Sequence, residues 1–222
     1  MIKYLLKITP ERQYVQDLID GKLYMNAAAY YHHIENGTTG QEDPMEAAVS
    51  STSMMFINPL YPIYCMYQVE DSEIMGNKIH IKKSVVEGFG TKDGFIALIP
   101  YNLFVERLST CDTNGHRLCH GSVHYGFINL SMTKKLFIES GIKQFFIKPK
   151  KFSEQNEYRI VVCEPLKRQF RNQILDGMNI KVETGFDHRI YVVPHGFADI
   201  MNLYKISKLH YDDNNYYIPV EA

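Results

Sequence analysis

The stretch KKFSEQNEYRIVVCEP, residues 150–165, places an amide, a carboxylate and a guanidinium at alternate positions where a run of strand-forming residues begins. These groups belong to Gln155, Glu157 and Arg159. Alternate residues of a strand share one face, so a strand that starts by Gln155 directs all three groups the same way. That face is either exposed to solvent or part of a functional site. At a site, a fixed carboxylate can stabilise positive charge that develops in a transition state.

A second acidic group lies in the segment EDPME, which contains Asp43 and Glu46. A guanidinium can bind a carboxylate through two parallel hydrogen bonds. We therefore expect Asp43 or Glu46 to pair with Arg159, which would leave Glu157 free for a ligand. Simpler interpretations remain open, because Asp-Pro is common in turns. Glu157 can also pair with Arg159 or Lys151 on an exposed strand face, where an ion pair contributes little.

Potential soft metal ligands are concentrated in residues 111–126. They are Cys111, His116, Cys119, His120 and His124. Zinc takes four Cys or His ligands in tetrahedral geometry. The spacing of the first three is not a standard one, however, and no second pair of ligands follows. We therefore interpret the segment as a polar connecting loop and expect no structural zinc.

The bulk composition is that of a globular protein. The chain has 222 residues, of which 45% are hydrophobic and 22% charged, enough for a sizeable core in a single domain spanning residues 1–222. A net charge of −1 excludes a whole-chain field that attracts nucleic acid or membrane. A local basic patch remains available to nucleic acid, formed by Lys148, Lys150, Lys151, Lys167, Arg168 and Arg171.

Cellular location is indicated by what the sequence lacks. No apolar run approaches the length that spans a bilayer, and the N-terminus has no signal-peptide pattern. We expect a cytoplasmic protein with no membrane partner, in which the four cysteines are reduced. The phosphate-binding pattern GxxxxGK[ST], a GxGxxG after a strand and the GxSxG elbow are also missing.

Strand-forming runs are the elements that must position these side chains. Strands are predicted at residues 2–8, 22–26, 61–69, 79–85, 94–100, 125–130, 144–149, 157–164, 190–194, 206–212 and 216–220. Helices are predicted after a Thr9 cap up to Gly21, after an Asn26 cap through residue 35, and at 101–109, 131–140 and 197–203. Helices do not alternate one per strand. The pattern predicts an α+β fold with mixed, largely antiparallel sheets and a few peripheral helices.

The N-terminal segment LLKITPERQYVQDLIDGKLYMN, residues 5–26, combines a strand, a capped helix, a glycine stop and a second strand. It resembles the opening of ADP-ribosyltransferase-like folds. These begin with a strand carrying His or Arg, then Thr, a helix and a Gly-x-Leu that enters the next strand. At the His position this chain has Lys7, a point charge that can contact a pyrophosphate or ribose oxygen. The resemblance implies an ADP-ribosyltransferase-like fold.

Two segments resemble the bacterial family called domain of unknown function 2971. In that family a Gly-x-Leu-Tyr strand leads to Asn-Asp-Pro-x-Glu, and a Lys-rich turn later leads to Glu-x-Glu-Tyr/Trp-Arg. Residues 21–47 match the first pattern, with Glu42 in place of Asn. Residues 148–159 match the second, with Gln155 in place of the first Glu. The resemblance covers about residues 1–165.

Together these resemblances imply a protein that cleaves NAD and passes ADP-ribose to a nucleic acid, a protein or water. Glu157 would be catalytic, holding the nicotinamide-ribose 2′-hydroxyl, and Gln155 would contact the acceptor. Nicotinamide would stack on Tyr30 or Tyr31. The implied nucleotide-binding residues are Lys7, Thr9, Tyr24, Tyr30 and Tyr31, and the implied supporting residues are Asp43, Glu46 and Arg159. Small bacterial or phage-borne proteins of this kind often act in toxin or defence systems.

Two other functions remain open from the sequence. One is a non-catalytic module on the same scaffold that binds a nucleotide, a nucleic-acid end or a protein partner. The other is a metal-dependent phosphodiesterase that uses Asp43, Glu46, Glu157 and a lysine such as Lys148. Carboxylates and lysine suit Mg²⁺ and phosphate, although no spacing singles these residues out.

Overall fold

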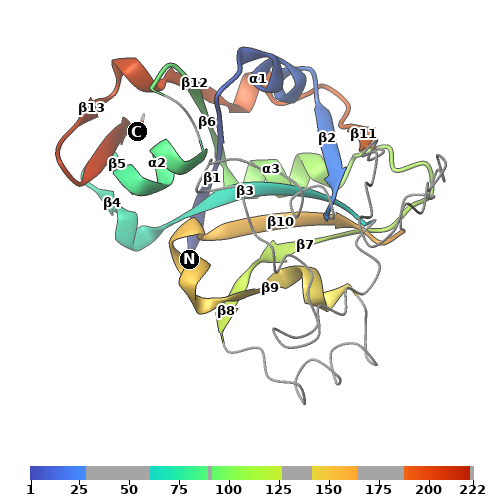
Figure 1. Cartoon of the computed structure of the whole chain (residues 1–222). Helices are drawn as coiled ribbons and strands as arrows, with labels where there is room; N and C mark the ends of the chain where they lie inside the picture. Colours follow the sequence, from blue (N-terminus) through green and yellow to red (C-terminus); the bar gives the residue numbers. More distant parts are fainter. Residues whose placement is uncertain (29–60, 90–91, 127–141, 165–187, 221–222) are drawn as a thin grey trace, which may run out of the picture.

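The computed structural model describes residues 1–28, 61–89, 92–126, 142–164 and 188–220 of the chain (Figure 1). They form an α+β fold with mainly antiparallel sheets and a few short helices, as the sequence predicts. Within the described part of the chain, no helix has both the length and the apolar character needed to cross a bilayer.

Three sheets contain all the strands that the structure describes. The eight-stranded main sheet consists of β1 (Ile2–Thr9), β2 (Lys22–Ala27), β3 (Pro62–Glu70), β6 (Phe95–Pro100), β7 (Leu118–Ser122), β10 (Glu157–Val162), β11 (His188–Val192) and β12 (Asn202–Lys205). A smaller sheet consists of β4 (Ile74–Met75), β5 (Lys78–Lys82), β13 (His210–Tyr211) and β14 (Asn215–Pro219). A parallel pair is formed by β8 (His124–Gly126) and β9 (Ile147–Pro149).

Helical segments connect these strands. The α-helices are α1 (Arg12–Ile19), α2 (Lys83–Phe89) and α3 (Tyr101–Leu108). Short 3₁₀ segments are η2 (Asp71–Glu73), η3 (Lys143–Phe146), η4 (Lys150–Gln155), η5 (Ala198–Ile200) and η6 (Ile206–Lys208).

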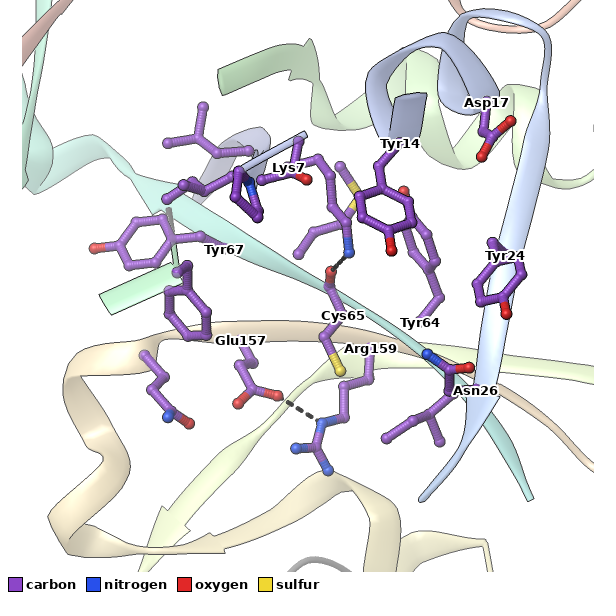
Figure 2. A pocket seen from close by; sticks show the side chains of 18 of the residues that line it. Lys7, Tyr14, Asp17, Tyr24, Asn26, Tyr64, Cys65, Tyr67, Glu157 and Arg159 are labelled. Atoms are coloured by element: carbon purple, nitrogen blue, oxygen red, sulfur yellow. Dashed lines mark hydrogen bonds and ion pairs between the residues drawn. The ribbon is translucent and has the colours of Figure 1, made fainter. Parts of the chain in front are cut away.

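The main sheet is split along one edge of β3. β10 pairs with one edge of β3 from Ile63 to Tyr67. On the other edge, β1 pairs with residues from Tyr67 onward, whereas β2 pairs only with Pro62 and Ile63. These registers leave residues 64–66 between the two strands, where backbone groups need other partners. One such partner is Lys7, whose Nζ donates a hydrogen bond to the Cys65 carbonyl at 2.9 Å (Figure 2).

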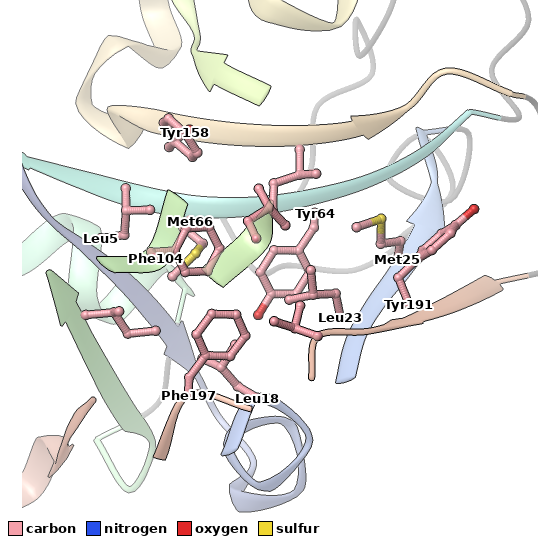
Figure 3. Close-up of a cluster of buried hydrophobic side chains, with 14 of the residues drawn as sticks. Leu5, Leu18, Leu23, Met25, Tyr64, Met66, Phe104, Tyr158, Tyr191 and Phe197 are labelled. Carbon is pink, nitrogen blue, oxygen red and sulfur yellow. The ribbon is translucent and has the colours of Figure 1, made fainter. Parts of the chain in front are cut away.

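Two hydrophobic cores cover the two faces of the main sheet. Alternation along β1 places Leu5 in one core and Leu6 in the other, both fully buried. The first core contains residues of α1 and α3, including Leu18 and Phe104 (Figure 3). The second core lies between the main sheet, α2 and the smaller sheet. β1 is therefore packed on both of its faces, and this close packing makes the strand rigid.

The first helix begins later than the sequence predicts. Thr9 is the last residue of β1, where it pairs with Phe95, and α1 begins only at Arg12, so Thr9 is not the N-cap. The N-cap is Glu11, whose backbone N–H donates to Thr9 Oγ1 at 3.4 Å. The predicted stop at Gly21 is confirmed, with a positive φ of 78° just past the C-cap Asp20.

Other predictions are wrong where one short apolar run contains two elements instead of one. The predicted strand 79–85 ends at Lys82, and α2 begins at the next residue. The predicted strands 144–149 and 206–212 each begin with a 3₁₀ turn, and the predicted helix 197–203 is a 3₁₀ turn followed by β12. Short apolar runs fit either element, and tertiary contacts decide between them. The segment read as a connecting loop contains β7.

Several predicted elements lie wholly or partly outside the described residues. Asn26 is inside β2, where it pairs with His188 and Ile63, so it does not cap a helix. The remainder of the helix predicted after it, and the helix predicted at 131–140, fall outside the described ranges.

Candidate functional site

A pocket with a cavity volume of about 270 Å³ lies at the split in the main sheet. Its walls come from β1, α1, β2, β3, α2, β9, η4 and β10. Six of the predicted catalytic, nucleotide-binding and supporting residues line it, namely Lys7, Thr9, Tyr24, Gln155, Glu157 and Arg159. Segments that are distant in the sequence thus meet at one pocket, because β1 and β10 both pair with β3.

The other four predicted site residues lie outside the described part of the chain. They are Tyr30, Tyr31, Asp43 and Glu46. A contact between the acidic segment and Arg159 therefore stays a prediction, and so do the metal-dependent phosphodiesterase and its use of Asp43 and Glu46.

Glu157 lies between two buried cations. Its Oε1 accepts a hydrogen bond from Lys148 Nζ at 2.8 Å. Its Oε2 accepts one from Arg159 Nε at 2.7 Å, which Figure 2 shows. Arg159 Nη1 also donates to the Phe145 carbonyl at 2.6 Å. Glu157 is 5% exposed, Lys148 4% and Arg159 1%. The prediction that Glu157 is left free for a ligand is wrong, because residues two apart on one strand face can reach each other.

The two cations keep Glu157 ionised. Burial by itself raises the pKa of a carboxyl group, but the charges and hydrogen bonds of Arg159 and Lys148 outweigh it and lower the pKa of Glu157 to about 2. A carboxylate has about four lone-pair positions, so each oxygen can still accept a hydrogen bond from a ligand hydroxyl. The arrangement supplies a fixed negative charge in the wall of the pocket.

Gln155 reaches the same cluster from outside the strand. β10 begins at Glu157, because Gln155 ends η4 and Asn156 adopts the left-handed conformation with φ 37°. The expectation that Gln155 belongs to the strand is therefore wrong. Lys148 Nζ nevertheless donates to Gln155 Oε1 at 2.7 Å as well as to Glu157. Lys148 thus holds both predicted catalytic side chains in place.

The left-handed turn is tied to β3 by three hydrogen bonds between Asn156 and Gln68. The Gln68 backbone N–H donates to the Asn156 carbonyl, Gln68 Nε2 donates to Asn156 Oδ1, and Asn156 Nδ2 donates to the Gln68 carbonyl. Their donor–acceptor distances are 2.7 to 2.8 Å. This lock determines where the turn ends and where Glu157 enters the pocket.

Lys7 contributes a third positive charge, beside those of Lys148 and Arg159. Its Nζ lies 4.2 Å from the centroid of the Tyr64 ring, in addition to the hydrogen bond to the Cys65 carbonyl. Burial lowers the pKa of Lys7, against the opposing charges of Cys65 and Glu157. Within the described residues, no carboxylate forms an ion pair with Lys7. A cation in this state gains from an anionic ligand, because the ligand replaces solvation that burial removes.

Aromatic rings line the remaining wall. Tyr24 stacks on His188 with ring centroids 4.4 Å apart, and Tyr14 of α1 lines the pocket while 44% exposed. Tyr64 and Tyr67 of β3 complete this wall. Flat, apolar faces beside fixed charges suit a ligand that combines rings with phosphate.

Lys148, Tyr14, Tyr64 and Tyr67 are pocket residues that the site prediction omits. The sequence indicates Lys148 for a surface basic patch and for the phosphodiesterase alternative; because Lys148 is buried in β9, it does not belong to a surface patch. A signal was available, because a single lysine within the apolar run QFFIKP indicates a buried and paired charge. The tyrosines gave no such signal among the 16 of the chain.

The cysteines and histidines of residues 111–126 do not line the pocket, although the hydroxyl of Tyr125 in the same segment accepts a hydrogen bond from the Glu157 backbone N–H at 2.8 Å. His120 Nδ1 is 2.5 Å from the hydroxyl of Tyr158, and His116 Nδ1 is 2.5 Å from a carboxylate oxygen of Glu164. In the part of the chain that the structure describes, no three His, Cys, Asp or Glu side chains are grouped to hold a metal ion.

Comparisons of the chain with protein-family models, with curated proteins and with solved structures found no match. Membership of the domain of unknown function 2971 family and an ADP-ribosyltransferase-like fold therefore stay predictions from sequence motifs.

Proposed function

We propose that the pocket binds NAD and that the protein is ADP-ribosyltransferase-like, breaking the bond between nicotinamide and ribose. The observation that carries this proposal is the meeting of the N-terminal motif, represented by Lys7 and Tyr24, with Gln155 and Glu157 at one pocket. The resemblance assigns these residues to one nucleotide site, and they lie far apart in the sequence.

The geometry supports a role for Glu157 in the bond-breaking step. Positive charge develops on the ribose as nicotinamide departs, and a fixed anion stabilises that charge more than it stabilises neutral ground-state sugar. Glu157 is such an anion, ionised and held on both oxygens. Lys7 would contact the pyrophosphate or a ribose oxygen, and Gln155 would contact the acceptor, a macromolecule or water.

A second candidate is a non-catalytic module that binds a nucleotide in the same pocket. The contacts of Glu157 favour it, because Lys148 and Arg159 neutralise the carboxylate. Neutralisation weakens the field that Glu157 exerts on a sugar. Under this alternative the pocket binds NAD or ADP-ribose without cleaving either.

The decisive measurement is incubation of the protein with NAD labelled on its adenylate part, followed by assay of free nicotinamide and of label on protein or nucleic acid. We expect release of nicotinamide by the native chain and its loss in Glu157→Gln, with circular dichroism at the assay temperature showing a folded variant. Glu154→Gln is the matched control, because Glu154 is an exposed acid of η4 that pairs with Lys82. Stabilisation by NAD without any cleavage would leave the binding module as the function.

Lys7→Met should remove NAD binding with little change in stability. The substitution relieves the desolvation of a partly buried cation but removes its hydrogen bond to the Cys65 carbonyl, so we expect only a small change in melting temperature in the absence of ligand. NAD at a hundredfold excess over its Kd should stabilise the native chain by about 2.7 kcal/mol, raising its melting temperature by roughly 5–10 °C. That rise should disappear in Lys7→Met.

Lys3→Met is the control for this variant. Lys3 lies on the same strand, but its side chain is exposed and pairs with Asp71 at 3.3 Å. The NAD-induced rise should persist in this variant. If neither NAD nor ADP-ribose stabilises the native chain, both nucleotide-binding proposals are wrong.

A further inference from the structure

Two cysteine sulfurs meet across neighbouring strands, on the same face of β10 as Glu157 and Arg159 but farther along the strand. Cys119 of β7 pairs with Val161 of β10, and Cys163 directly follows β10, where its backbone N–H donates to the Arg117 carbonyl at 2.8 Å. Val161 and Cys163 are two apart, so both face the same side as Cys119. The two Sγ atoms are 2.9 Å apart.

We propose that Cys119 and Cys163 form a redox modification site, at which a low-molecular-weight disulfide such as oxidised glutathione converts the two thiols into a cross-strand disulfide. A thiolate of one cysteine attacks oxidised glutathione and releases one glutathione thiolate. The second cysteine then attacks the mixed disulfide and releases the other. The two protons lost by the cysteines end on the two glutathiones, so two cysteine thiols are oxidised and one disulfide is reduced.

The two sulfurs need to move only a small distance to form the disulfide bond. A disulfide bond is about 2.05 Å long, so the sulfurs need to approach by about 0.9 Å. Both residues are only partly buried, which gives the small oxidant access to them. Both cysteines pack against the same small hydrophobic cluster, which includes Val161 and Phe145 and keeps the side chains together.

Local charge sets the conditions under which the site reacts. Burial raises the pKa of Cys119 to about 11, and the hydrogen bond with Cys163 acts in the same direction, while Arg117 opposes both. The thiolate is the attacking form, so oxidation should accelerate as the pH rises. Arg117 lies close enough to both sulfurs to stabilise a thiolate on either.

The disulfide would connect β7 to the strand that carries Glu157 and Arg159. It would close a loop between residues 119 and 163 and so restrict the unfolded chain. The inference does not depend on NAD binding, because it rests on the two strands and their sulfurs alone.

The test equilibrates the full-length chain in mildly alkaline glutathione buffers of increasing oxidised fraction, then applies acid quenching, alkylation and peptide mass spectrometry. We expect a linked peptide pair containing Cys119 and Cys163, with Cys65 and Cys111 recovered as alkylated thiols. The oxidised chain should melt roughly 5–10 °C higher than the reduced chain.

Serine variants separate this pairing from other oxidation. Cys119→Ser and Cys163→Ser should each abolish the linked peptide and the rise in melting temperature, whereas Cys111→Ser should retain both. Glutathione adducts without a linked peptide would overturn the proposal. A link from Cys119 to another cysteine, or a Cys119–Cys163 link that forms only in denaturant, would overturn it equally.

Discussion

Replacing Glu157 by glutamine should lower the free energy of unfolding by about 3–5 kcal/mol, since it leaves two buried cations without their shared counter-ion. Lys148 and Arg159 donate to opposite oxygens of this carboxylate, and all three side chains are buried. Chemical denaturation at neutral pH measures the change. Glu154→Gln, which removes an exposed acid, should change stability by well under 1 kcal/mol.

The same carboxylate predicts a loss of stability in acid. The pKa of Glu157 is lowered from 4.5 to about 2 in the folded state, so the unfolded chain binds a proton first as the pH falls. The stabilisation is fully present above the unfolded value and decreases as the pH falls from there toward 2, by roughly 3 kcal/mol in total. The free energy of unfolding, measured by denaturation at several pH values in this range, should fall more steeply with decreasing pH for the native chain than for Glu157→Gln. Equal pH dependence of the two would show that Glu157 is not paired as described.

Gly196→Ala should destabilise the fold by roughly 3–5 kcal/mol, the range of a severe steric substitution. Gly196 has φ +59°, and a Cβ there would lie 1.9 Å from the carbonyl oxygen of Ile19 at the end of α1. That carbonyl also accepts a hydrogen bond from the Phe197 backbone N–H at 3.3 Å. The close approach joins the end of α1 to the segment after β11, and both flank β2, which carries Tyr24.

Gly115→Ala is the matched control for this substitution. Gly115 has φ +84°, but nothing lies within 4 Å of the Cβ position there. The alanine should therefore lower the free energy of unfolding only through its left-handed backbone conformation, by about 1–2 kcal/mol. A comparison of the denaturation midpoints of the two variants separates the cost of the steric contact from the cost of the left-handed backbone conformation. Equal losses would contradict the close packing of Gly196 on α1.

The alternation of apolar residues predicted the strands that form the pocket. β1, β2, β3 and β10 all occur close to their predicted positions, because each has a run that is buried on at least one face. The periodicity also placed Glu157 and Arg159 on one face. It did not show that they contact each other, since the same pattern is compatible with two separate partners.

Local signals were weakest where one short segment changes from one element to another. Val85 reads as the continuation of a strand, yet it packs in the second core from α2. Leu118 and Cys119 read as a loop because histidines and glycines surround them, yet β10 provides a pairing edge for them. In both places the neighbouring strand or core supplied the deciding contacts.

By itself, the sequence determined the α+β class, the main strands and the meeting of an N-terminal lysine with a late carboxylate. Tertiary structure alone decided the split along β3, the position of Lys148 between Gln155 and Glu157, and the contact of Cys119 with Cys163. The physical reason is the long separation along the sequence between the residues that make these contacts. Periodicity reports which face of an element is buried, whereas these contacts depend on the register between strands that are distant in the sequence.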